Sequence, residues 1–339
     1  MGVYVNKNGK PNHKWATGAA KALKKQYEKY PSLVTPFEEL FEVVHINYDV
    51  VFNDVLTRWS EEAQTISAQG IDAAEIATRM VRWLEGAEQT DDNFAWTHVG
   101  DVVLYRFFNL VRQRVKAKVA KQIHEALEPN TDGAVTRWSI IAHSLGTAVT
   151  HDVLHAMNSS TPNEASIPIL DAIAPKPNVV AMLANVSKTL ENDAEVYESV
   201  VVPPTSCDVY LSANNVFDPF VSKKYYIPEP FNPRGRPLWD KAIDNKKFID
   251  IEPENIHEIN VHSIQNYLVN PHVHVPLLRA LCGPGSIPGQ LEKRKIDEFE
   301  NIPLLDKKEA LDELLNEIQD ESWYDVIATL LPKLEAADD

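Results

Sequence analysis

Hydrophobic positions recur at helical spacing in two long parts of the chain. The first pattern predicts an amphipathic helix over residues 14–30 that ends near Pro31, because apolar side chains return every four residues. The second predicts a long helix over 99–127, and we expect its basic stretch, 112–121, on a solvated face. The apolar positions are Trp15, Ala19, Leu23 and Tyr27 in the first helix, and Val103, Phe107, Leu110 and Val111 in the second.

Shorter apolar runs alternate with further helical patterns. Runs that are rich in β-branched and aromatic residues, and too short for a typical helix, predict buried strands. These strands are expected at residues 41–48, 135–142, 167–174, 207–213 and 247–252. Helices are expected at residues 146–157, 176–190 and 262–282. This alternation predicts an α/β fold with a mostly parallel sheet flanked by helices.

Two segments stand outside the alternation. Residues 50–97 contain helical stretches with a polar break near their end, so they are the natural candidate for a helical insertion or cap. After Pro284 the composition becomes more charged, and apolar residues again return at helical spacing. We therefore expect one main domain over 1–283 and a C-terminal helical appendage over 284–339.

Composition and charge narrow the classes of function. The chain has 339 residues, of which 44% are hydrophobic and 24% charged, so it can bury a large core. Its net charge of −16 disfavours nucleic acid and anionic membrane surfaces as partners. The N-terminus has no apolar signal-peptide core, and no run approaches the roughly 18 apolar residues of a membrane span. Cys207 and Cys282 alone make no disulfide framework or zinc ribbon. We expect a cytoplasmic protein without stable membrane insertion; the oligomeric state stays open.

The segment Ala142-His-Ser-Leu-Gly146 carries the strongest chemical signal. An apolar strand precedes it and a helix follows, which is the context of a nucleophile elbow, a tight turn that presents a serine. The usual pattern is Gly-x-Ser-x-Gly, and here alanine replaces the first glycine. Ser144 is therefore the predicted nucleophile, and the backbone N–H of Leu145 is a predicted oxyanion donor. Its neighbour His143 is given no catalytic role.

The acid and the base are expected after the serine, in loops that follow later strands. Asp218 comes in a turn directly after the apolar run 207–213, whereas Asp171 and Asp208 lie within predicted strands, so Asp218 is favoured as the acid. Among the downstream histidines His262 is favoured as the base, because it follows the last predicted strand and opens a helical pattern. His257 is the competing candidate.

A second motif points to different chemistry. His151 and His155 lie four residues apart on one predicted helix face, similar to the zinc-binding pattern His-Glu-x-x-His. An aspartate, Asp152, replaces the usual glutamate. Because this helix emerges from the elbow, we interpret the two histidines as polar positions on a helix that packs beside the sheet, and we expect no metal.

Three segments together resemble the α/β-hydrolase superfamily, specifically its lipase- and esterase-like members. They are Ala-His-Ser-Leu-Gly-Thr, Asn-Val-Phe-Asp-Pro and Asn-Val-His-Ser-Ile-Gln-Asn-Tyr-Leu, within residues 14–282. The resemblance implies the α/β-hydrolase fold, a Ser-His-Asp triad made by Ser144, His262 and Asp218, and acyl-enzyme chemistry without a cofactor. Nothing in the three segments specifies a substrate.

The resemblance breaks down at the N-terminus. Members of this superfamily usually carry a strand ending in His-Gly before the first helix on this side of the sheet, and that loop gives the second oxyanion donor. Here Met1-Gly2-Val3 falls where the loop should lie, so the strand and its histidine are missing. Either the chain is truncated or the loop is built differently. In the first case a backbone N–H at Gly2 is the predicted second donor.

These observations lead to two hypotheses of function. The first is a serine hydrolase that cleaves a small-molecule carboxylic ester, with thioesterase or acyltransferase activity available to the same residues. Trp59, Met80, Trp83 and Leu84 of the expected cap suit an apolar acyl group. The second is a non-catalytic scaffold that keeps the fold and binds a protein partner.

Overall fold

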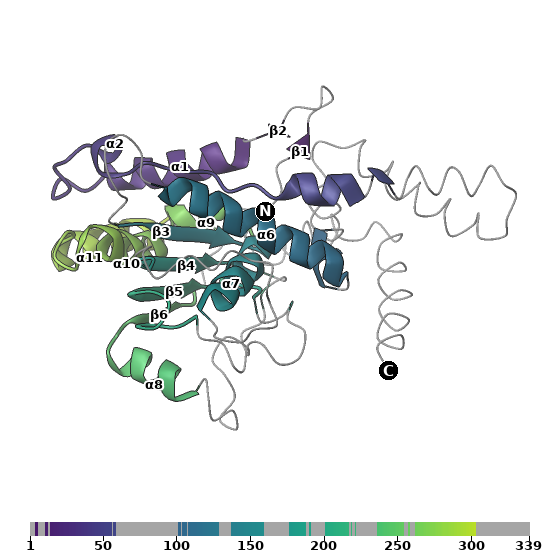
Figure 1. Ribbon diagram of the computed structural model, residues 1–339. Helices are drawn as coiled ribbons and strands as arrows, with labels where there is room; N and C mark the ends of the chain where they lie inside the picture. The colour runs from purple at the N-terminus through teal and green to yellow at the C-terminus, as the bar shows by residue number, and fades with distance from the viewer. Residues whose placement is uncertain are drawn as a thin grey trace, which may run out of the picture.

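A four-stranded parallel sheet lies at the centre of the computed structural model (Figure 1). The structure describes residues 4–5, 11–12, 14–55, 57–58, 101–102, 104–106, 108–128, 137–158, 176–187, 190, 201–216, 218, 221, 236–253, 257 and 262–302. The strands are β3 (Ser139–His143), β4 (Val179–Leu183), β5 (Val209–Ala213) and β6 (Phe248–Ile251), and they lie side by side in chain order. Parallel neighbours need long crossover connections. The prediction of an α/β architecture with a parallel sheet is confirmed at this level.

Helices cover both faces of the sheet (Figure 1). Helices α1 (Lys14–Tyr27), α9 (Ile264–Val269) and α10 (Pro271–Cys282) pack on one face. Helices α7 (Leu145–Asn158) and α8 (Arg236–Asp244) pack on the other, and α6 (Asn109–Leu127) packs against α7. Strand β4 shows the division, because Val179, Ala181 and Leu183 join the first layer, whereas Val180 and Met182 join the second. Successive side chains of a strand point to opposite faces, so both faces of β4 lie in the core.

This central position corrects one sequence prediction. Residues 176–190 were expected to form a helix, but Val179–Leu183 is a strand in which all five residues are buried. A strand buried on both faces is apolar throughout, so it shows no alternation and cannot be distinguished from a buried helix by periodicity.

The predicted strand at 41–48 is also wrong. These residues form neither helix nor strand, and they follow the short helix α2 (Phe37–Leu40). Val43 and Val44 are about half exposed, at 48% and 53%. The backbone of Asn47 pairs with the Gln122 side chain of α6, through N–H to Oε1 at 3.0 Å and Nε2 to the carbonyl at 2.7 Å. A helix side chain therefore satisfies the hydrogen-bonding groups that a neighbouring strand would otherwise satisfy.

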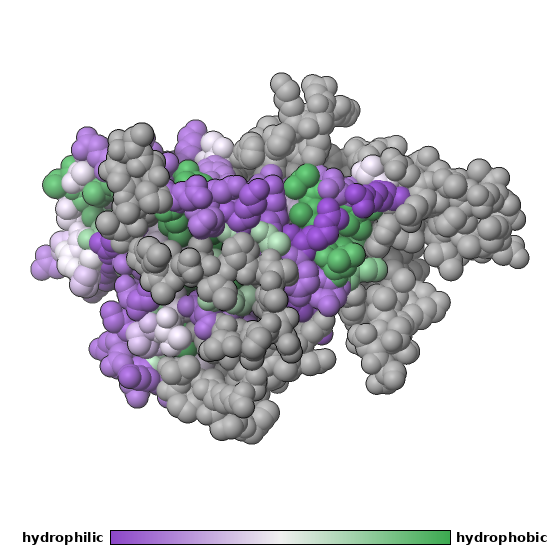
Figure 2. Space-filling view, in the orientation of Figure 1, coloured by the Kyte–Doolittle hydropathy of each residue, from purple (hydrophilic) through white to green (hydrophobic). Residues whose placement is uncertain are grey.

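The second long helix differs from its prediction in two ways. Residues 101–102 and 104–106 are helical, but Phe108 is extended, and α6 begins only after it. The buried stripe is Val111, Val115, Val119 and Ile123, whereas Leu110 is 78% exposed. Arg112 and Lys116, expected on a solvated face, are buried because they occupy the same side of the helix as this stripe. Figure 2 shows mainly hydrophilic residues where α6 crosses the surface, with smaller apolar areas beside them.

Several remaining predictions agree with the structure. The predicted helix over 14–30 is α1, and the expected strands at 135–142, 207–213 and 247–252 correspond to β3, β5 and β6. The helix expected at 262–282 is divided at Asn270, because the residue before Pro271 favours extended backbone. A two-stranded sheet of β1 (Tyr4–Val5) and β2 (Pro11–Asn12) was not predicted.

Other predictions fall largely or wholly outside the described residues. They are the strand at 167–174, most of the insertion at 50–97 and most of the appendage at 284–339. The described residues 50–55 and 57–58 of the insertion are helical, and so is α11 (Gly289–Glu300) of the appendage. None of the helices in the described ranges has the length and hydropathy needed to span a bilayer.

One buried histidine makes the stability of the fold depend on pH. His274 in α10 accepts a hydrogen bond from the Tyr30 hydroxyl at Nε2, at 2.7 Å, and donates from Nδ1 to the Leu268 carbonyl, at 3.0 Å. Burial lowers the pKa of His274 to about 4. Between its ordinary pKa of 6.5 and about 4, the unfolded chain binds a proton that the folded chain does not, so stability is lost as the pH falls through this window.

Urea unfolding of the wild type and of His274→Gln tests this effect. Glutamine does not titrate in this range. Between pH 7 and pH 5 the free energy of unfolding of the wild type should therefore fall by about 2 kcal/mol more than that of His274→Gln. The carboxylates that titrate in this range are common to both proteins and cancel. A difference that stays constant with pH would contradict the prediction.

Candidate active site

The carboxyl ends of the parallel strands meet at one edge of the sheet. The aligned last residues are His143, Leu183, Ala213 and Ile251. Ser144 follows β3 directly, with φ at 53° in the left-handed region, and its N–H donates to the Leu183 carbonyl at 3.1 Å. Helix α7 begins at the next residue. A strand that turns sharply into a helix in this way presents the serine side chain at the sheet edge where ligands bind in open α/β folds.

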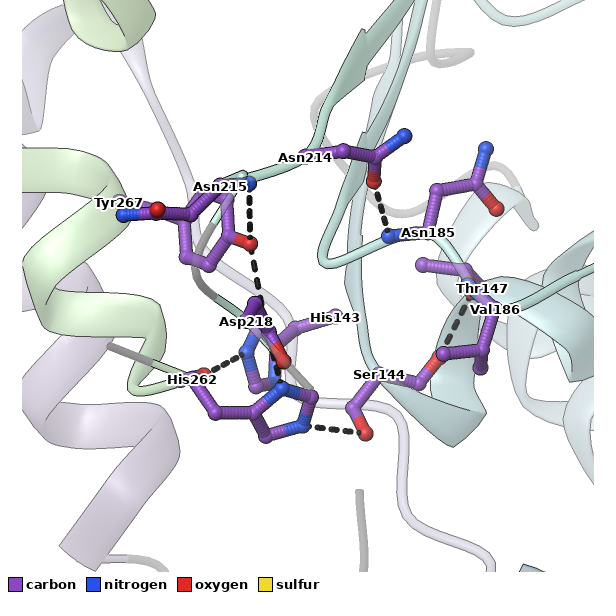
Figure 3. A network of polar contacts seen from close by, with 10 residues as sticks. All are labelled: His143, Ser144, Thr147, Asn185, Val186, Asn214, Asn215, Asp218, His262 and Tyr267. Carbon is purple, nitrogen blue, oxygen red and sulfur yellow. Dashed lines mark hydrogen bonds and ion pairs between the residues drawn. The ribbon is translucent and has the colours of Figure 1, made fainter. Parts of the chain in front are cut away.

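Three of the sequence-predicted residues form one continuous hydrogen-bonded chain (Figure 3). Ser144 Oγ is 2.8 Å from His262 Nε2, and His262 Nδ1 is 2.7 Å from Asp218 Oδ2. An ionised carboxylate can only accept, so Nδ1 carries the hydrogen and Nε2 accepts from the serine hydroxyl. All three residues are buried, with 7%, 4% and 3% of their surfaces exposed for Ser144, His262 and Asp218. The structure therefore brings together a hydroxyl, a base and an acid from widely separated parts of the sequence.

Local turns place the acid and the base. Asp218 lies just beyond β5, in a turn closed by its N–H and the Asn215 carbonyl at 3.0 Å. His262 comes just before α9, where the Ser263 side chain caps the helix by accepting from the Gln265 N–H. Both positions agree with the sequence prediction of a turn after a strand and of the start of a helix.

The competing candidates lie elsewhere. Asp208 is at the amino end of β5, where it pairs with Lys176 at 2.8 Å, so it is at the opposite edge of the sheet. The ring of His257 packs against Phe299 of α11, with centroids 4.2 Å apart. Asp171 lies outside the described residues.

Tyr267 belongs to the site and was missed by the sequence reasoning. Its hydroxyl donates to Asp218 Oδ2 at 3.0 Å and accepts from the Asn215 N–H at 2.8 Å. Burial and the charge of Asp218 raise the pKa of Tyr267 well above its ordinary value, so the hydroxyl keeps its proton. The signal was the position of the tyrosine on α9, five residues after His262.

Removal of this hydroxyl should weaken the site without removing a triad residue. In Tyr267→Phe, Asp218 loses one donor and the Asn215 N–H loses its acceptor, so we expect ester hydrolysis to fall about tenfold and stability by about 1–3 kcal/mol. Initial rates with p-nitrophenyl butyrate and urea unfolding measure the two effects. Tyr210→Phe is the control, because that tyrosine is equally buried but lies on β5, where its hydroxyl contacts the Asn185 amide at 3.3 Å. Equal effects of the two substitutions would contradict the role assigned to Tyr267.

Thr147 connects the elbow to the loop that follows β4. Its hydroxyl donates to the Ser144 carbonyl at 2.6 Å and accepts from the Val186 N–H at 3.0 Å. Thr147 is fully buried, so these bonds are shielded from water. The backbone around the serine is therefore fixed from two sides.

Residues 184–187, the described part of the loop directly after β4, offer no unbonded backbone N–H to an oxyanion. Their four backbone N–H groups are already bonded within the protein: Ala184 to the Ala213 carbonyl, Asn185 to Asn214 Oδ1, Val186 to Thr147 Oγ1 and Ser187 to Asn185 Oδ1. Ala184 has φ at 47°, like Ser144 at the end of the neighbouring strand. Leu145 is the first residue of α7, where a backbone N–H has no partner within the helix. The other predicted donor, Gly2, lies outside the described residues.

The two histidines of the zinc-like motif lie together on α7, with their rings stacked at 6.1 Å. His151 Nδ1 is 3.5 Å from Asp152 Oδ1, and Asp152 is held by the Arg112 guanidinium. No group of three or more metal-ligating side chains occurs in the part of the chain that the structure describes. The surroundings of this pair are those of a helix packed in the interior.

The chain has no match to a protein-family model, to a curated protein or to a solved structure in the three comparisons made. The feature that bears on function is therefore the hydrogen-bonded chain of Ser144, His262 and Asp218 at the carboxyl edge of a parallel sheet.

Proposed function

We propose that this protein is a serine hydrolase of the α/β-hydrolase type that cleaves carboxylic esters. The observation that carries the proposal is the buried Ser144–His262–Asp218 chain, with distances of 2.8 and 2.7 Å, at a serine held with φ at 53°. A nucleophile on a strained turn, an adjacent base and an orienting carboxylate are the features by which such triads are recognised on unrelated folds.

The geometry suggests the following reaction. Ser144 Oγ attacks the ester carbonyl carbon while its proton moves to His262 Nε2, and the carbonyl oxygen becomes the oxyanion near the Leu145 N–H. The tetrahedral intermediate collapses, the C–O bond to the alcohol breaks, and the alcohol leaves with the proton from His262. Water then attacks the acyl-enzyme, again giving a proton to His262, and the acid leaves as Ser144 regains its proton. Asp218 orients the ring and stabilises the imidazolium.

The substrate class is a small carboxylic ester, and no cofactor takes part in the proposed reaction. A thioester would react through the same steps with a thiol as the leaving group. Because the hydroxyl, the base and the acid are all retained in contact, we favour an enzyme over a non-catalytic scaffold.

An active-site-directed probe tests the proposal. The full chain is treated with a fluorophosphonate and digested, and the modified peptide is identified by mass spectrometry, in parallel with hydrolysis of p-nitrophenyl acetate and butyrate. We expect a single adduct on Ser144 and loss of hydrolysis in proportion to labelling. Absence of both labelling and hydrolysis would refute the proposal and favour the scaffold.

A further inference from the structure

His143 holds the base-bearing turn against the elbow. Its Nε2 is 2.6 Å from the main-chain carbonyl oxygen of His262, and the two rings are 4.9 Å apart between centroids (Figure 3). His143 is only 3% exposed. The contact joins residues 119 positions apart in the sequence, one at the end of β3 and the other just before α9.

The chemistry of the contact fixes the direction of the hydrogen bond. A carbonyl oxygen can only accept, so Nε2 of His143 carries a hydrogen and donates it. The bond is to the backbone of His262 and leaves both of its ring nitrogens to Ser144 and Asp218. Two hydrogen bonds thus hold the ring, and a third holds the main chain to which the ring is attached.

We propose that His143 is a positioning residue, which sets the distance between the Ser144 hydroxyl and the His262 ring through its bond to the His262 carbonyl. The inference rests on the proposed function and extends it to a residue that does not touch the reacting atoms. Ser144 follows His143 directly, so the donor moves together with the nucleophile. A displacement of about 1 Å between catalytic groups can lower the rate about 100-fold, which makes such a tether valuable.

Two amide variants separate this role from a general role in packing. Glutamine places its amide nitrogen near the position of Nε2, whereas asparagine is one methylene shorter and cannot reach the carbonyl. We therefore expect kcat with p-nitrophenyl butyrate to fall about 10- to 100-fold in His143→Asn, with little change in KM, and to recover largely in His143→Gln. His272→Gln is the matched control, since that histidine lies on the exposed side of α10 beside Glu300.

A second readout does not depend on catalysis. The His262 Nδ1 proton, hydrogen-bonded to Asp218, should give a downfield proton NMR signal, which is assigned by its loss in His262→Gln. We expect this signal in the wild type and His143→Gln, and its broadening or loss in His143→Asn. The inference is overturned if His143→Asn retains both the wild-type kcat and the signal, or if the two amide variants behave alike. A wild type that neither hydrolyses the ester nor reacts with the fluorophosphonate would instead refute the proposed function. The NMR comparison would still show whether the His143 hydrogen bond positions the His262 ring.

Discussion

Replacing Ser144 by alanine should lower kcat/KM for p-nitrophenyl butyrate by about 10⁴-fold or more. The substitution removes the atom that forms the acyl-enzyme and leaves His262 and Asp218 paired. It also keeps the β-carbon, so the fold should be retained. Initial rates at saturating and limiting ester concentration, with circular dichroism as a check of the fold, measure the effect.

Ser139→Ala provides the matched control for this experiment. Ser139 begins the same strand and lies at the opposite edge of the sheet, so its loss should leave the rate within about twofold. If Ser144→Ala retained more than a few per cent of the activity, the hydrolysis would have another origin, and the assignment of the nucleophile would be wrong.

Replacing Arg112 by methionine should destabilise the protein by about 3–5 kcal/mol. Arg112 Nε donates to Asp152 Oδ2 at 2.9 Å, and the Tyr105 hydroxyl donates to the same oxygen at 2.6 Å. Burial alone would raise the pKa of Asp152, but the hydrogen bond from His151 and the charge of Arg112 hold it well below its ordinary value. Without the guanidinium, the carboxylate would remain buried without its balancing charge.

Denaturant unfolding of Arg112→Met and Arg114→Met measures this cost. Arg114 lies on the same helix and contacts Asp54 at 3.4 Å, but both side chains are exposed, so its removal should cost less than about 1 kcal/mol. The double variant Arg112→Met/Asp152→Leu should recover much of the stability, because it leaves no unpaired charge. Equal losses in the two single variants would show that the buried pair is no more important than a surface pair.

The residues of the site could be predicted because their signals are local. Ser144 lies in a short pattern with fixed backbone requirements, and Asp218 and His262 follow it in an order set by the connectivity of an α/β sheet. The structure brings all three within hydrogen-bonding distance. Their catalytic roles remain predictions until the substitutions are made.

The supporting residues could not be predicted, because their partners are distant in the sequence. Nothing near Arg112 indicates that Asp152, forty residues later, will neutralise it inside the core. The bonds from His143 to the His262 carbonyl and from Tyr267 to Asp218 likewise exist only after the sheet has formed. Such contacts depend on tertiary packing, which hydrophobic periodicity does not encode.

The errors in secondary structure have a related origin. Strand β4 is apolar on both faces because helices cover both sides of the sheet, and this coverage is not visible in five consecutive residues. The opposite error occurs at 41–48, where residue types typical of a strand form no strand. There the Gln122 side chain of α6 bonds the backbone N–H and carbonyl of Asn47. In both places the surroundings of the segment decided its structure.

Two neighbouring strands, β3 and β4, are each followed directly by a residue in the left-handed conformation. These residues are Ser144 and Ala184, and only the serine has a side chain that can react. At Ser144 the backbone strain, on the order of 1–2 kcal/mol, accompanies the presentation of a nucleophile. Ala184 has the same backbone conformation, but its side chain takes no part in the proposed reaction. Ala184 is fully buried in the core, so glycine at position 184 would relieve the strain only by giving up a packed methyl group and adding flexibility to the unfolded chain. Packing beside the candidate active site thus accounts for an alanine in a conformation that glycine adopts more readily.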